Sequence, residues 1–153
     1  MTSKDLALLG GAHVHLDDHL NHLEARGWRV SHLYERDPER RAGLCERLGA
    51  RQVSLTALAE SGCRGAVVCS ETAHHEEDIL AALRAGLPVF VEKPMAGSAD
   101  AARRCAELAG QRGLILHCGY FMRTNAALRR LQAAVQAGQL GRVIEASMRF
   151  AHD

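Results

Sequence analysis

Short apolar runs alternate along the chain with longer stretches in which apolar residues recur at helical spacing. The apolar runs are typical of strands buried on both faces of a sheet. We predict strands near residues 6–9, 28–34, 52–53, 65–69, 89–91 and 114–118. The intervening stretches predict helices that each bury one face. These helices lie near residues 16–26, 38–48, 56–60, 76–84, 98–109 and 124–137. Strands and helices in this alternation predict an α/β fold, a doubly wound parallel sheet with helices on both faces.

Two of the predicted helices can be oriented from their residues. Asp37 followed by Pro38 is typical of a helix start, with a capping side chain and then proline at the first helical position. The residues of this helix that we expect to face the sheet are Ala42, Cys45 and Leu48. Those expected to face inward from the last helix are Leu128, Leu131 and Val135.

Length and composition narrow the classes of function. A chain of 153 residues with 47% hydrophobic residues suits one domain whose core needs no disulfide or metal. The formal net charge of +1 does not indicate nucleic acid or an anionic membrane as a partner. The five cysteines include no C-x-x-C pair, as expected for reduced thiols. The apolar run at residues 6–10 is too short for a signal peptide or a membrane span. We therefore expect a cytoplasmic protein.

The loop after the first strand is a candidate nucleotide site, because ligands of a doubly wound sheet bind beyond the carboxyl ends of the strands. Its glycines allow a tight turn that brings backbone N–H groups close to a pyrophosphate. The loop consists of Gly10, Gly11, Ala12, His13, Val14 and His15. Alanine and histidine occupy the second and third glycine positions of the dinucleotide-binding pattern. Since any strand-to-helix turn favours glycine, this loop alone leaves dinucleotide binding and a structural turn open.

Two charged residues follow the second predicted strand. Glu35 comes 25 residues after Gly10, close to the spacing of the acid that holds an adenosine ribose diol. Arg36 beside it could instead meet a 2′-phosphate, and both could simply be solvated charges at a strand end. The combination with the glycine turn favours binding of NAD or NADP. Glu35 favours NAD, so NAD is the expected cofactor.

Three histidines, His15, His19 and His22, follow one another at helical spacing on the first predicted helix, with Asp18 nearby. Such a stripe could bind zinc. A polar helix flank is the commoner arrangement, and here the stripe spans two turns without a cysteine. We therefore predict no metal site.

The residues around the fifth predicted strand carry more specific motifs. Residues 65–96 read GAVVCSETAHHEEDILAALRAGLPVFVEKPMA, a strand, a loop ending in histidine, a helix ending in A-L-x-A-G, a strand and E-K-P. Residues 119–123 (GYFMR) and 139–143 (QLGRV) add two further motifs. Together they resemble the Gfo/Idh/MocA (glucose-fructose oxidoreductase / inositol dehydrogenase) family over nearly the whole chain. Glu71 and Thr72 depart from the proline and asparagine common at these positions, and two family glycines are replaced in the turn at residues 10–15.

The resemblance implies a Rossmann-like nucleotide-binding domain and hydride transfer between a nicotinamide cofactor and a sugar, polyol or related hydroxy compound. It implies Lys93 as a donor beside the reacting C–O group and Glu92 as the residue that orients either that lysine or the nicotinamide ribose. It also implies a cis peptide bond before Pro94 and a local positioning role for His75. The expected cofactor residues, in addition to the loop at residues 10–15, are Glu35, Arg36, Ser70, Glu71, Thr72, His75, Glu92, Lys93 and Arg123.

The resemblance also predicts how the chain is divided. Residues 1–120 would form the NAD(P)-binding domain, residues 121–140 a crossover helix, and residues 141–153 the first strand of an α+β substrate domain that is otherwise missing. Alternating apolar residues from Arg142 to His152 support that strand. We therefore expect a fragment that is inactive by itself, from an enzyme that forms homo-oligomers. His152 lacks the context of the family's catalytic histidine. The alternative is a non-catalytic nucleotide-binding or sensor module.

Overall fold

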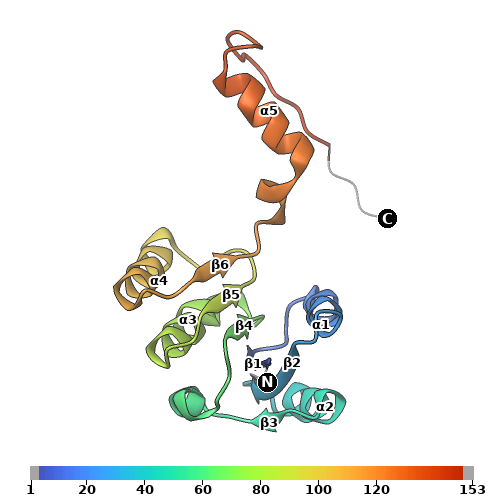
Figure 1. The fold of residues 1–153 in the computed structure, drawn as a ribbon, viewed down its shortest axis with the longest axis vertical. Coiled ribbons are helices and arrows are strands. Elements are labelled where there is room, and N and C mark those ends of the chain that lie inside the picture. Colours follow the sequence, from blue (N-terminus) through green and yellow to red (C-terminus); the bar gives the residue numbers. More distant parts are fainter. Residues whose placement is uncertain (1–3, 150–153) are drawn as a thin grey trace. The chain divides into compact units, whose positions relative to one another are not determined.

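The computed structural model describes residues 4–149 of the chain. Residues 1–119 and residues 120–153 form two compact units. The first unit holds the whole sheet, and the second holds a single long helix with its flanking segments (Figure 1).

The first unit is built on a six-stranded parallel sheet in the order β3-β2-β1-β4-β5-β6. Its strands are β1 (Asp5–Leu9), β2 (Arg29–Tyr34), β3 (Arg51–Gln52), β4 (Ala66–Val68), β5 (Val89–Val91) and β6 (Leu116–Cys118). The chain runs outward from β1 to β3 and then returns to place β4 on the other side of β1. The strand order therefore reverses between β1 and β4, and the loops that follow these two strands lie side by side at the switch point.

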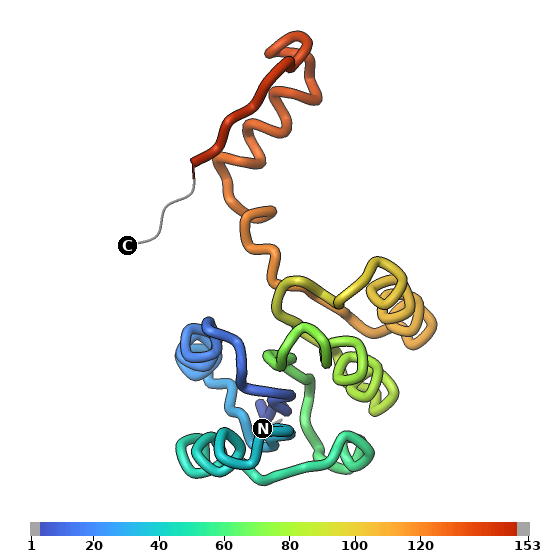
Figure 2. The backbone as a smooth tube through the Cα atoms, turned by 180° about the vertical axis from the view of Figure 1, so that it is seen from behind, coloured from blue at the N-terminus to red at the C-terminus, as the bar shows by residue number. Residues whose placement is uncertain are grey.

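Helices cover both faces of this sheet. They are α1 (Leu16–Glu24), α2 (Pro38–Leu48), α3 (His75–Arg84) and α4 (Ala99–Arg112), with a 3₁₀ segment η1 (Leu55–Glu60). Figures 1 and 2 show α1 and α2 on one side of the strands and α3 and α4 on the other. Alternate residues of β1 accordingly enter two separate apolar clusters, Leu6 and Leu8 in one, Ala7 and Leu9 in the other. The predicted doubly wound α/β fold is confirmed.

The start of α2 follows the sequence prediction, and its buried face does so in part, since Cys45 and Leu48 pack partly buried against the core and Ala42 does not. The Asp37 carboxylate accepts a hydrogen bond from the Arg40 N–H at 2.7 Å, with Pro38 at the first helical position. Leu44 is the buried residue of this helix, whereas Ala42 is exposed. The two residues lie roughly 200° apart around the helix, so they cannot both face the sheet. Alanine is apolar but small, and its position says little about which side is buried.

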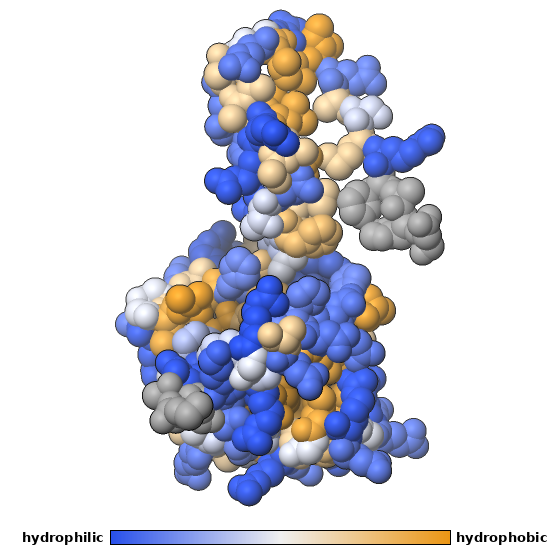
Figure 3. Space-filling view, turned by 45° about the vertical axis from the view of Figure 1, so that its right-hand side comes forward, coloured by the Kyte–Doolittle hydropathy of each residue, from blue (hydrophilic) through white to orange (hydrophobic). Residues whose placement is uncertain are grey.

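The second unit contains the 3₁₀ segment η3 (Phe121–Thr124) and the helix α5 (Ala126–Gln136), which Asn125 caps through hydrogen bonds from Ala127 and Leu128. The expectation that Leu131 and Val135 face inward is wrong for this chain, because both are exposed. Apolar side chains appear in orange on the surface of this unit in Figure 3.

Residues 142–149 form no strand, and the rest of the segment predicted up to His152 lies outside the described residues. A strand is stable only when its backbone groups pair with a neighbour. The proposed division of the chain after residue 120 stays a prediction. Within residues 4–149, no helix is both long and apolar enough to cross a bilayer.

Candidate cofactor-binding site

The glycine turn after β1 is pressed directly against the loop after β4. Gly10 has a φ of +77°, and a Cβ atom at this position would lie 2.4 Å from the Cα of Ser70. The Gly10 N–H donates to the Tyr34 carbonyl at 2.7 Å, which ties the turn to β2 as well. The turn therefore needs glycine here for two independent reasons, a left-handed backbone and a contact with no room for a side chain.

The remainder of the turn presents backbone donors at the start of α1. The His13 N–H donates to the Cys69 carbonyl at 3.1 Å. Among residues 4–149, the N–H groups of Ala12 and Val14 have no protein acceptor, and Val14 is exposed. A hollow of about 340 Å³ beside the turn is lined by residues that include Gly11, His13 and Arg40. Donors of this kind at a helix start fit the pyrophosphate of a dinucleotide.

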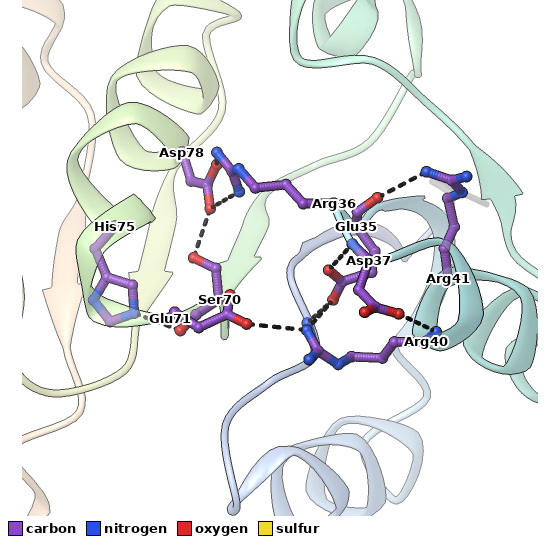
Figure 4. Close-up of polar contacts among 10 residues, drawn as sticks. Glu35, Arg36, Asp37, Arg40, Arg41, Ser70, Glu71, His75 and Asp78 are labelled. Carbon is purple, nitrogen blue, oxygen red and sulfur yellow. Dashed lines mark hydrogen bonds and ion pairs between the residues drawn. The ribbon is translucent and has the colours of Figure 1, made fainter.

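Glu35 is the buried acid of the site, with an exposed fraction of 2%. Its carboxylate accepts hydrogen bonds from the N–H of Gly11 at 2.8 Å and of Asp37 at 2.9 Å, and from Arg40 at 3.2 Å (Figure 4). A carboxylate can accept about four hydrogen bonds. Glu35 thus keeps capacity for one further donor, such as a ribose hydroxyl.

Arg36 does not join Glu35 but reaches to the start of α3. Its guanidinium lies 2.8 Å from Asp78 and 2.6 Å from Glu77 and covers the Tyr34 ring. Burial alone would lower the pKa of this guanidinium, but its hydrogen bonds to Asp78 and Glu77 raise the pKa above its ordinary value. The basic side chains next to Glu35 are instead Arg40, which bonds its carboxylate, and Arg41, which donates to its backbone carbonyl at 3.2 Å, and the sequence reasoning missed both. A role for Arg36 at a 2′-phosphate stays a prediction.

Hydrogen bonds of buried polar groups fix the loop after β4. The Ser70 hydroxyl donates to Asp78 at 2.6 Å. The ring of His75, fully buried, lies 3.0 Å from the Ser70 carbonyl through Nε2 and 2.8 Å from the Pro94 carbonyl through Nδ1. His75 therefore links the loops after β4 and β5, the contacts of a positioning residue. The predicted cis bond between Lys93 and Pro94 is confirmed.

Glu92 is the buried carboxylate of the loop after β5, and 3% of the residue is exposed. It lies 2.6 Å from His19 Nε2 and 3.6 Å from His13 Nε2, and it accepts a hydrogen bond from the Lys93 N–H at 2.8 Å. Burial would raise the pKa of Glu92, but hydrogen bonds from His19 and from the Lys93 N–H hold it below its usual range. The carboxylate is therefore ionised at neutral pH.

Lys93 is partly buried, and its ammonium makes no hydrogen bond or ion pair with any of residues 4–149. An ammonium without a protein partner can donate to the oxygen of a hydroxyl or carbonyl compound.

The three histidines considered as a zinc-binding stripe contact different partners in the structure. His19 bonds Glu92, His15 lies 3.5 Å from Asp18, and His22 Nδ1 lies 2.7 Å from the Asp18 carbonyl. No group of three His, Cys, Asp or Glu side chains suited to a metal occurs among the described residues. No pattern in the sequence indicated the bond from His19 to Glu92, since the two residues come from distant segments.

The expected site residues divide between the two units. Those from Gly10 to Lys93 meet at the carboxyl edge of the sheet, with Glu71 beside Arg40 and Thr72 opening a short 3₁₀ turn, η2 (Thr72–His74). Arg123 belongs to the second unit, where it covers the Tyr120 ring. Its role at a cofactor stays a prediction.

The ionisation of His13 predicts a pH dependence of stability. Burial lowers the pKa of His13 below 6.5, with Glu92 opposing the shift. The folded chain then holds fewer protons than the unfolded chain, so this residue stabilises the fold above about pH 6.5, and the stabilisation is lost as the pH falls. We expect His13→Gln to flatten the fall of the melting temperature between about pH 7 and pH 5. An equally steep fall in the variant would show that His13 titrates normally.

Comparison with known proteins agrees with this geometry. Residues 6–120 match the family described as "Oxidoreductase family, NAD-binding Rossmann fold", Gfo/Idh/MocA. An inositol 2-dehydrogenase of Streptomyces avermitilis is 34% identical over 144 residues, which are 90% of this chain and 41% of the relative. A 1,5-anhydro-D-fructose reductase of Ensifer adhaerens is 30% identical over 142 residues, 91% of this chain and 43% of the relative.

A solved structure shows the same fold. The WlbA dehydrogenase of Chromobacterium violaceum, in complex with NADH and UDP-GlcNAcA, superposes with a TM-score of 0.79 and 26% identity. The alignment covers 93% of this chain and 42% of that one. The chain thus spans about two fifths of the length of these three proteins. On the match over residues 6–120, the chain belongs to the Gfo/Idh/MocA family of oxidoreductases with an NAD-binding Rossmann fold.

Proposed function

We propose that the chain is the nucleotide-binding part of an NAD(P)-dependent oxidoreductase that moves a hydride to or from a sugar, polyol or related hydroxy compound. The observation that carries this proposal is the position of two acids on either side of one glycine turn. Glu35 bonds the Gly11 N–H, and Glu92 contacts His13 of the same turn and fixes the Lys93 backbone. One acid suits an adenosine ribose, and the other stands beside a free lysine.

Each residue has a separable task in this proposal. Glu35 accepts a hydrogen bond from the adenosine ribose, and the N–H groups of Ala12 and Val14 face the pyrophosphate. Lys93 donates a hydrogen bond to the oxygen of the substrate C–O group and can carry its proton. Glu92 holds the Lys93 backbone in place through the 2.8 Å hydrogen bond. When bound, the cofactor supplies the hydride acceptor or donor.

We further propose NAD as the preferred cofactor. The buried Glu35 carboxylate can accept from a 2′-hydroxyl and repels a 2′-phosphate. Arg36, the residue that could have favoured NADP, is engaged by Glu77 and Asp78. Positioning of the substrate is assigned to residues beyond this domain, and assembly into a homo-oligomer is proposed by analogy with the family.

The cofactor site is tested by titrating the chain with NADH. We expect Glu35→Gln to weaken NADH binding by about tenfold, on the order of 1.4 kcal/mol, because it removes a charge-assisted hydrogen bond to the ribose. The matched control is Glu39→Gln, an exposed glutamate on the first turn of α2, which is expected to bind NADH as the parent chain does. The proposal fails if neither NADH nor NADPH at millimolar concentration raises the melting temperature of the parent chain.

A non-catalytic nucleotide sensor is the second candidate. The observation that favours it is the glycine turn, in which alanine and histidine stand at the second and third glycine positions. Both candidates predict cofactor binding, and hydride transfer separates them. If the protein encoded by the whole gene binds NADH but neither oxidises polyols with NAD nor reduces the corresponding carbonyl sugars, the sensor is correct.

A further inference from the structure

Arg40 connects two carboxylates that come from different segments of the site. Its Nη1 atom lies 3.2 Å from Glu35 Oε2 and 3.2 Å from Glu71 Oε1. Glu35 follows β2, whereas Glu71 follows β4, so the ion pairs cross the switch point of the sheet (Figure 4). We call these three residues the Glu35–Arg40–Glu71 bridge.

Glu71 and Arg40 of the bridge are both charged at neutral pH. A hydrogen bond from its own backbone and the ion pair with Arg40 hold the pKa of Glu71 below its usual range. Burial would lower the pKa of Arg40, but hydrogen bonds to Glu35 and Glu71 raise it. Two carboxylates and one guanidinium leave a net negative charge at the bridge.

The ion pairs around Glu35 also determine which arginine side chains can bind an anion. Arg40 shares its Nη1 atom between Glu35 and Glu71, and Arg36 is paired with Glu77 and Asp78. Arg36 and Arg40 therefore each already have two carboxylate partners. Arg41 instead donates to the backbone carbonyl of Glu35 at 3.2 Å. A phosphate could gain Arg40 only if Glu71 released it.

We propose that Glu71 is a specificity residue that excludes NADP by holding Arg40 and by adding a second negative charge beside Glu35. This inference rests on the proposed function, since it concerns the same cofactor site. The 2′-phosphate of NADP carries a charge near −2 and is repelled by both carboxylates, whereas the 2′-hydroxyl of NAD is neutral and can donate to Glu35. Because Glu71 is about half exposed, salt screens its effect.

The test compares dissociation constants of NADH and NADPH for the parent chain and for Glu71→Gln, which keeps the size of the side chain and removes its charge. We expect the ratio of the NADPH constant to the NADH constant to fall by about tenfold at low salt, mainly through tighter NADPH binding. The change should shrink as sodium chloride is added. Adding Arg40→Gln to Glu71→Gln should reduce the gain, because the part that depends on the released guanidinium is then lost.

Two further variants separate this proposal from its competitors. Glu76→Gln removes an equal charge from α3, where Glu76 pairs with Arg104, and should leave the ratio unchanged. Glu77→Gln frees Arg36 from one of its two partners. A fall in the ratio with Glu77→Gln but not with Glu71→Gln would make Arg36 the phosphate-reading residue and overturn the proposal.

An unchanged ratio in Glu71→Gln, with NADH binding intact, would also overturn the proposal while leaving the proposed function standing. Failure of the parent chain to bind either dinucleotide would instead refute the proposed function. The two failures are therefore distinguished within one set of titrations.

Discussion

Replacing Asp78 with alanine is expected to lower the free energy of unfolding by about 3 kcal/mol, because it removes the buried partner of Arg36 and leaves that guanidinium only the exposed Glu77. Asp78 is fully buried and accepts hydrogen bonds from Arg36 at 2.8 and 3.2 Å and from the Ser70 hydroxyl at 2.6 Å. The variant would leave the Ser70 hydroxyl without its acceptor. Unfolding in urea, followed by circular dichroism, measures the change.

Glu77 provides the matched control, since it binds the same guanidinium from the solvent side. Its side chain is 64% exposed, against 0% for Asp78. An exposed ion pair contributes about 0–1 kcal/mol, so Glu77→Ala should change the free energy of unfolding by less than about 1 kcal/mol. Equal losses of unfolding free energy in the two variants would contradict the conclusion that Asp78 is the more important partner of Arg36. Asp78→Asn, which keeps an acceptor for Ser70, should be intermediate.

Asp78 also shows what could not be predicted from the sequence. Three consecutive acids at the start of α3 suit the helix dipole, and nothing in the pattern distinguishes them. The structure places one against the sheet, where it holds Arg36 and Ser70, and leaves Glu77 exposed. Which of three successive helix residues faces inward depends on how the helix is rotated against the sheet, and that is a property of the packing.

Packing also explains why Arg40, and not the expected Arg36, contacts the Glu35 carboxylate. The spacing from Gly10 indicated that Glu35 follows the second strand, and in the structure Glu35 lies at the glycine turn, where it bonds the Gly11 N–H. The neighbour in sequence, Arg36, points to α3, whereas Arg40 reaches Glu35 from the first turn of α2. Glu35 and Arg36 both lie beyond the end of β2, in a bend where neighbouring side chains need not point the same way, so adjacency in sequence does not predict adjacency in space.

The order of strands and helices was predictable from the apolar pattern because each buried run and each helix face reports its own local environment. The second unit shows where that reasoning ends. The apolar face predicted for the helix α5 exists, but Leu131 and Val135 are exposed, since none of the described residues covers them. A pattern predicts that a face is to be buried, but it does not say by what.

Gly10→Ala is expected to have the other large effect, a loss of about 3–4 kcal/mol of unfolding free energy. The new Cβ atom would lie 2.4 Å from the Ser70 Cα and 2.6 Å from its backbone nitrogen, so backbone must move. Overpacking of this kind costs about 1–3 kcal/mol. The left-handed φ of +77° adds about 1–2 kcal/mol for any residue with a Cβ.

The comparison with Gly43→Ala isolates that contact. Gly43 lies inside the helix α2, has no neighbour within 4 Å of its built Cβ, and is not among the glycines of positive φ. Alanine there should stabilise the chain by about 0.5–1 kcal/mol, because glycine loses more backbone entropy in a helix. Opposite signs for the two substitutions are therefore expected in the same urea titration.

Gly10→Ala should also weaken NADH binding under conditions where the variant is still folded, since displacement of Ser70 moves the loop that carries Glu71 and His75. A Gly10→Ala chain of parental stability would show that the turn after β1 does not lie against Ser70. A destabilised chain with parental NADH affinity would show that this close contact supports the fold but not the cofactor site.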